Sequence, residues 1–143
     1  MNNLIETINY NLKVNLEDII KLNDITKEYN LILSKEQIIS LINTKNNTLK
    51  EIGRIEFNNT IIKDIISNFY DSPYIDEDNY FNTIEELINI FYIYRNNFNL
   101  SDDQIIKYMK LRFNNYSNGS LKLLLSNDLE YLENNLKEII NEL

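Results

Sequence analysis

Apolar residues recur every three to four positions along most of the chain, which is the spacing of amphipathic helices. This pattern predicts an all-α fold over residues 1–143, a compact single-domain bundle of about six or seven helices with no strand. The widest apolar surface falls within residues 77–97 and is formed by Ile84, Leu87, Ile88, Phe91 and Tyr94, with Ile90 and Ile93 on a second side. Since neighbours pack against two sides of such a helix, residues 77–97 are predicted to form the central one.

Two helix starts are marked by capping boxes, in which Ser34 is followed by Gln37 and Ser101 by Gln104. The first helix is predicted to end near residue 52, where Gly53 can adopt the left-handed conformation of a C-cap. The second is predicted over residues 102–113, with three basic side chains outward, Lys107, Lys110 and Arg112.

Further helices are predicted from hydrophobic spacing alone. They cover residues 16–29 with Asn15 as N-cap, a run from Asn58 or Asn59 to a point before Pro73, residues 121–125, and a last helix capped by Ser126. Residues 1–14 have apolar positions at helical spacing but weak caps, which predicts a short or frayed helix.

The chain contains no cysteine and no histidine. This excludes disulfides, thiolate metal sites, cysteine nucleophiles and the Ser-His-Asp triad, and with them nearly all zinc sites. No Gly-rich phosphate-binding motif is present either. We therefore assign no catalytic residue, no metal ligand and no cofactor, and an enzyme would have to use carboxylates, Tyr, Lys, Arg or Ser.

The formal net charge is −8 at pH 7. Nucleic-acid binding requires clustered Lys and Arg, so we expect no nucleic-acid partner. The N-terminus lacks the basic and apolar regions of a signal peptide, and no apolar run approaches the ~20 residues of a membrane span. We expect a cytoplasmic protein that does not bind membranes.

Between Lys63 and Arg95 the chain has no basic residue. The acids in this interval are Asp64, Asp71, Asp76, Glu77, Asp78, Glu85 and Glu86. One interpretation is a surface for a cation or a basic partner. The structural alternative is a solvated face plus acids in the first turn of the helix at residues 77–97. An EF-hand is excluded, because neither Asp71 nor Asp76 begins a loop with the required Gly and Glu positions.

Three charges bracket the helix predicted between Asn59 and Pro73. Arg54 and Glu56 precede it and Asp71 follows it, so they form either a site or an ion pair that closes the turn. In the following turn, the structural alternative has Asp71 or Ser72 turning the chain and Tyr74 packing inward. The candidate ligand or partner surface comprises Arg54, Glu56, Asp71, Tyr74, Asp76, Asp78 and Tyr80.

Several segments together carry a family resemblance: residues 49–57 and 69–75, Asn79-Tyr80, Phe91-Tyr92, Leu100-Ser101-Asp102-Asp103, Tyr108-Met109-Lys110, Phe113-Asn114 and Gly119-Ser120-Leu121. Over about residues 33–132 the chain resembles an uncharacterised family of small acidic proteins from clostridia and related Gram-positive bacteria, labelled a domain of unknown function. The chain departs from the family pattern at Tyr70, where the pattern has Cys, and at Lys122-Leu123. The resemblance implies a bacterial, cytosolic setting and brings no activity.

These observations favour a non-enzymatic helical module that binds a protein partner or self-associates through the acidic region and its aromatic residues. The alternative is a carboxylate-based metal- or ligand-binding protein, or an enzyme, that uses Glu56, Asp71 and Asp76 or Asp78. A third hypothesis is an acidic mimic of nucleic acid. The interaction module predicts that a partner or a dimer will be found. The metal- or ligand-binding protein predicts that a divalent metal stabilises the fold, and the mimic predicts salt-sensitive binding to a cationic protein.

Overall fold

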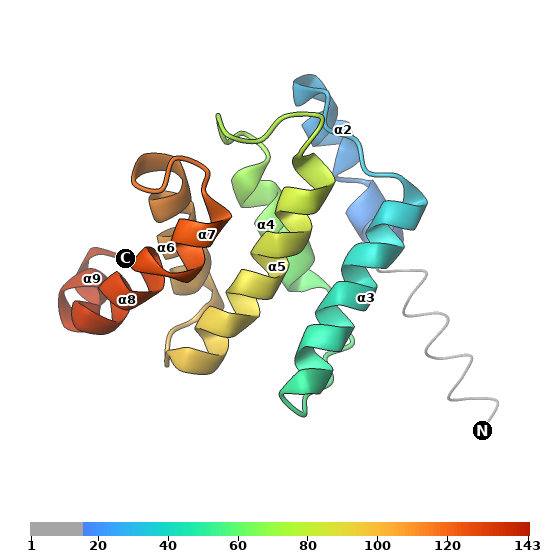
Figure 1. The fold of residues 1–143 in the computed structure, drawn as a ribbon. Coiled ribbons are helices and arrows are strands. Elements are labelled where there is room, and N and C mark those ends of the chain that lie inside the picture. The colour runs from blue at the N-terminus through green and yellow to red at the C-terminus, as the bar shows by residue number, and fades with distance from the viewer. Residues whose placement is uncertain (1–15) are drawn as a thin grey trace.

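The structure is a computed structural model that describes residues 16–143, and within this part the chain is all-α with no strand. The predicted helix over residues 1–14 and its neighbour Asn15 lie outside the described residues. The elements in order are α2 (Asn23–Thr26), the 3-10 helix η1 (Lys27–Tyr29), α3 (Lys35–Glu51), α4 (Thr60–Phe69), α5 (Tyr80–Asn97), α6 (Asp102–Asn115), α7 (Leu121–Leu125), α8 (Asn127–Asn134) and α9 (Leu136–Glu142). The predicted all-α class is confirmed (Figure 1).

Helix α5 is the centre of the bundle, as predicted, and contacts α3, α4, α6 and α7. Its predicted apolar stripe is buried, together with Ile90 and Tyr92. Ile93 was expected on the buried side and is 38% exposed, because Tyr92 takes the inward position instead. No helix among residues 16–143 has both the length and the apolar character needed to cross a membrane.

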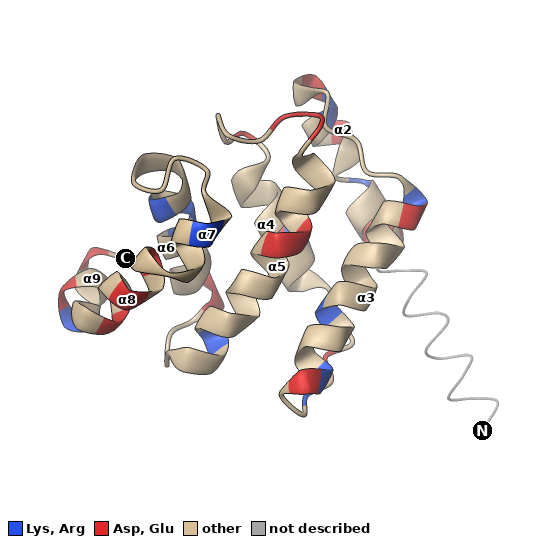
Figure 2. Ribbon diagram, in the orientation of Figure 1, with Lys and Arg blue, Asp and Glu red and all other residues tan. Residues whose placement is uncertain are grey.

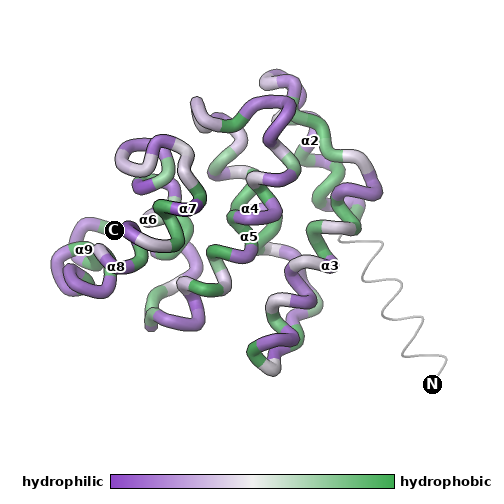
Figure 3. Tube along the Cα trace, viewed as in Figure 1, coloured by the Kyte–Doolittle hydropathy of each residue, from purple (hydrophilic) through white to green (hydrophobic). Residues whose placement is uncertain are grey.

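Helices α3 and α5 lie side by side in one layer, and α4 lies behind α5 and runs opposite to both (Figure 1). The loop between α3 and α4 therefore lies at one end of the layer, and the loop between α4 and α5 lies at the other. Helices α6 to α9 cover the side of α5 away from α3. Figure 3 shows hydrophobic and hydrophilic positions alternating along the helices and a hydrophobic stretch where α3 ends.

The two predicted capping boxes and the predicted C-cap at Gly53 are confirmed. Both Ser34 and Ser101 accept a hydrogen bond from the backbone N–H three residues on, and the side-chain oxygens of Gln37 and Gln104 accept one from the backbone N–H of the cap residue. Gly53 has φ +71°, and the N–H groups of Gly53 and Arg54 bond to the carbonyls of Lys50 and Leu49. This is the Schellman pattern, which requires a left-handed residue where Gly53 stands.

The prediction of one helix over residues 16–29 is wrong, because the chain folds back on itself there. Residues 16–20 are helical, a turn follows, and α2 and η1 end at Asn30 with φ +60°. Asn23 exchanges two hydrogen bonds with the backbone of Leu33, and the Thr26 hydroxyl donates to the Leu31 carbonyl. These side chains stabilise the reversal at the expense of a continuous helix.

Two further predicted helix boundaries are wrong. The C-terminal segment is divided into α8 and α9 at Asn135, and Ser126 does not cap it, since its hydroxyl donates to the Lys122 carbonyl. Helix α5 begins at Tyr80, because Asp76 and Asn79 exchange side-chain to backbone hydrogen bonds that form a turn first. The acids at residues 76–78 therefore precede the helix and do not occupy its first turn.

A polar seam joins α3 to α5. Glu85 of α5 accepts hydrogen bonds from the hydroxyls of Ser40 and Thr44, at 3.4 and 3.2 Å, and one turn further along Thr48 donates to Asn89 at 2.6 Å. The paired residues increase in number together, so the two helices run in parallel. Glu85 consequently belongs to a helix contact and not to a freely exposed acidic surface.

Candidate functional site

The seven candidate surface residues fall into two groups that the structure does not bring together. Arg54 and Glu56 lie before α4, and the others lie on or beside the loop that follows it, so the 10 residues of α4 separate them. At the rise of an α-helix this is a separation of about 15 Å. Arg54, Glu56 and Asp71 therefore form neither a common cleft nor a closed ion pair.

The second group surrounds the loop of residues 71–79, and Figure 2 shows acidic residues along it and no basic residue. Asp71, Asp76 and Asp78 are exposed there. Among the part of the chain that the structure describes, no three acidic side chains lie close enough together to hold a metal ion. These acids are dispersed along a solvated turn.

Tyr74 fixes this loop to the C-terminal half of the molecule. Its ring packs edge-on against Phe113, with centroids 6.2 Å apart, and its hydroxyl donates to Asn118 at 3.1 Å. The Ser72 hydroxyl accepts from the Tyr74 N–H and donates to Asn114. The structural interpretation of Ser72 and Tyr74, a turn followed by inward packing, is confirmed.

Gly119 shows how close this packing is. It has φ +80°, and a Cβ atom there would lie 2.5 Å from the Cβ of Tyr74. A larger residue would therefore push the Tyr74 ring away.

Tyr80 does not belong to a surface, because it is only 2% exposed. Burial raises the pKa of its phenol to about 12, and the Thr26 hydroxyl offsets part of this effect. Its side chain serves the core at the start of α5.

The first group lies in the α3–α4 loop, residues 52–59, which carries the two most exposed large apolar side chains within residues 16–143. Ile55 is 79% exposed and Phe57 is 61% exposed, and Ile52 adds a further side chain at 37%. Single exposed apolar residues are normal on protein surfaces, whereas several on one short segment mark an interaction site.

Lys45 of α3 holds this loop from inside the molecule. Although only 1% of the residue is exposed, its ammonium donates to the carbonyls of Glu56 at 2.6 Å and Asn58 at 2.9 Å. Burial lowers the pKa of Lys45, and the nearby Glu56 carboxylate opposes that shift. Because this buried cation bonds to two carbonyls that are two residues apart, it restricts the backbone that carries Ile55 and Phe57.

Arg95 holds the same loop from α5. Its Nη1 donates to Glu56 Oε2 at 2.8 Å, and its Nε lies 3.4 Å from Asp102 at the start of α6. The guanidinium also lies near the rings of Phe91 and Tyr92, 5.9 and 5.7 Å from their centroids. Glu56 is thus paired with Arg95 of α5 and not with a residue of the Asp71 loop, so the predicted ion pair between the turn and that loop is wrong.

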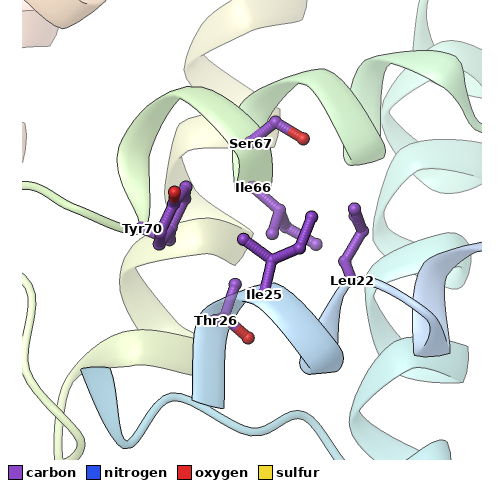
Figure 4. A pocket seen from close by; sticks show the side chains of 6 residues that line it. All are labelled: Leu22, Ile25, Thr26, Ile66, Ser67 and Tyr70. Atoms are coloured by element: carbon purple, nitrogen blue, oxygen red, sulfur yellow. The ribbon is translucent and has the colours of Figure 1, made fainter. Parts of the chain in front are cut away.

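A second apolar feature is a hollow between α2 and α4 (Figure 4). It is lined by Leu22, Ile25, Thr26, Ile66, Ser67 and Tyr70 and has a volume of about 160 Å³. Pockets for small molecules usually enclose about 300–1,000 Å³. This hollow has room for a side chain and not for a cofactor.

Sequence reasoning also missed a buried ion pair in the C-terminal half. Asp128 is 1% exposed and accepts hydrogen bonds from Arg112 Nε, at 2.8 Å, and from the Ser117 hydroxyl. The Arg112 guanidinium lies between the rings of Tyr116 and Tyr131, 4.1 and 4.5 Å from their centroids. The prediction that Arg112 points outward is wrong, because it meets this buried carboxylate.

Comparison with known proteins identifies the family of the chain. A model described as a family of unknown function, DUF6323, matches residues 18–142. The chain belongs to this family. The DUF6323 match begins before the predicted resemblance and so includes the α2–η1 reversal as well as the α3–α4 loop. No curated protein and no solved structure matches the chain.

Proposed function

We propose that this DUF6323 protein is a non-enzymatic interaction module that binds a protein partner through the α3–α4 loop. The observation that supports this is the rigid presentation of exposed apolar side chains: Ile55 and Phe57 point to solvent while Lys45 fixes the backbone beside them. A fixed segment loses less conformational entropy on binding than a mobile one, so its apolar surface contributes more of its free energy to affinity.

The acidic loop of residues 71–79 supports the proposal less well. Tyr74 is held by Phe113 and Asn118, and Tyr80 is buried, so the aromatic residues expected on that surface are used within the fold. We place the partner surface at the opposite end of α4 for this reason. The cellular setting that we propose is the bacterial cytoplasm, which rests on the family resemblance to small acidic proteins and not on the fold.

Site-specific photo-cross-linking tests this function. A photoreactive phenylalanine analogue replaces Phe57 in one variant and Tyr29, which is 52% exposed near α2, in a control variant. On irradiation in cells, we expect a discrete cross-linked product from position 57 that position 29 does not give. Adding Ile55→Asp should suppress that product, because a buried carboxylate without a partner opposes docking.

Equal labelling at both positions, or no product at position 57, would contradict the proposed surface. Thermal unfolding of each variant serves as the control for folding. Because the loop side chains are exposed, their replacement should leave the unfolding temperature close to that of the wild type.

A further inference from the structure

Within residues 16–143, backbone groups of three alternate residues attach the α3–α4 loop to α3. The Arg54 N–H donates to the Leu49 carbonyl, at 2.8 Å, and the carbonyls of Glu56 and Asn58 accept from Lys45. The attached residues are 54, 56 and 58, which is every second position. In an extended chain the backbone groups of alternate residues point to opposite edges, so those of Ile55 point away from α3.

That outer edge is unpaired at Ile55. Neither its N–H nor its carbonyl makes a hydrogen bond to any residue between 16 and 143, and its side chain is 79% exposed. Residues 54–59 lie outside the helices, and an exposed segment of this kind with unpaired backbone groups can accept another strand by main-chain hydrogen bonds.

The charges on this segment are complementary to themselves. In an antiparallel pair with Ile55 opposite Ile55 of a second copy, each Arg54 faces the Glu56 of the other chain. Arg54 has no ion pair among the described residues, and Glu56 uses only Oε2 for Arg95, which leaves Oε1 to accept. The twofold axis would repeat the contact, as in most homodimers.

We propose that the partner of the α3–α4 loop is a second copy of this chain, paired antiparallel through residues 54–57. This inference rests on the proposed function. Two hydrogen bonds join the Ile55 backbones, and two Arg54–Glu56 ion pairs flank them. The segment is short, so the dimer is of the weak, concentration-dependent kind that small interfaces form. A strand of unrelated sequence could use the same edge but would not supply both charges in this order.

Sedimentation velocity over a series of protein concentrations tests the pairing on the full chain. We expect the wild type to pass from monomer to dimer as concentration rises. Ile55→Pro removes the N–H that both copies need and should weaken association about tenfold or more. Arg54→Glu places like charges opposite each other and should also weaken it.

Ile32→Asp is the matched control. Ile32 is 57% exposed and also precedes a helix in a loop, but it lies at the other end of α3, so its replacement should leave the dimer unchanged. The helical circular dichroism of every variant should equal that of the wild type. A dimer that survives Ile55→Pro, or that Ile32→Asp also abolishes, overturns the pairing.

A wild type that remains monomeric at every concentration also overturns the second-copy proposal. The cross-linking at position 57 then separates the two conclusions. A cross-linked product containing a different protein leaves the loop as a partner surface for an extended segment of that protein, whereas no product contradicts the proposed function as well.

Discussion

Two buried charges in this molecule are accommodated in different ways. Among the described residues Lys45 has no carboxylate within ion-pairing distance, and it donates instead to two backbone carbonyls of the α3–α4 loop. Asp128 has a counter-charge in Arg112, a hydroxyl donor in Ser117, and two tyrosine rings that cover its partner. Both residues are 1% exposed, so burial alone does not distinguish them.

The difference indicates what each charge does for the fold. Asp128 joins α6 to α8 through side chains, and its own carboxylate is buried. Lys45 joins a helix to the backbone of a loop on which the Ile55 side chain is largely exposed. Buried ion pairs contribute little net stability, so Asp128 is best described as a constraint on helix packing. Lys45 is best described as a constraint on the shape of the loop.

Alkaline titration should have the largest effect, namely complete unfolding. Burial raises the pKa of Tyr80, Tyr92, Tyr94 and Tyr108 above the ordinary value of 10.0. Their contribution to stability is complete below about pH 10 and is lost as the pH rises towards their folded-state values. Circular dichroism should therefore decline above about pH 10, together with cooperative appearance of tyrosinate absorbance.

The contribution of Lys45 to stability changes in the opposite direction over part of this pH range. Its pKa is lowered from 10.5 by burial, so the unfolded chain binds more protons and stability from Lys45 rises as the pH approaches that value. Four tyrosines should outweigh one lysine. Independent ionisation of these tyrosines near pH 10 with the helical signal intact would contradict the expectation.

Asp128→Ala should produce the next largest effect. It leaves Arg112 without its buried partner, for which the expected loss is about 3–5 kcal/mol in the free energy of unfolding. Urea denaturation measures this loss, and Glu130→Ala on the exposed side of α8 is the control. The double variant Arg112→Met with Asp128→Leu should recover most of the stability, because no unpaired charge remains. A loss below about 1 kcal/mol for Asp128→Ala would place the ion pair among surface pairs.

Lys45→Met should have the smallest effect of the three on stability and the most local one. It leaves the carbonyls of Glu56 and Asn58 without donors, which costs about 1–3 kcal/mol before the relief of desolvation is counted. Hydrogen exchange should accelerate at the Arg54 amide and remain unchanged in α6 and α8. Lys50→Met, at an exposed position of the same helix, is the control. Uniform acceleration across the protein would show that Lys45 supports the whole core and not the loop.

Hydrophobic spacing predicted the class of the fold and the position of α5, and capping residues predicted the starts of α3 and α6. These features depend on neighbours within about one helical turn, which a sequence displays directly. The reversal near Asn23 could not be predicted in this way, because it depends on hydrogen bonds to Leu33 ten residues along the chain.

The candidate site was predicted only in part. Arg54 and Glu56 were selected, but the exposure of Ile55 and Phe57 depends on which helix faces are already occupied. A signal for both buried charges was present: Lys45 interrupts the apolar stripe that continues to Leu49, and Asp128 lies four residues from both Leu124 and Leu132. A charge inside an apolar stripe predicts a buried polar contact, although its partner depends on tertiary structure.

The polar seam between α3 and α5 also restricts how α3 can rotate against α5. Ser40, Thr44 and Thr48 recur every fourth residue, so a slip of one turn, about 6 Å, would still present hydroxyls to Glu85. A rotation of α3 about its own axis would remove all of them at once. The seam therefore sets the azimuth of α3 against the centre of the bundle more strictly than it sets the position of α3 along its own axis.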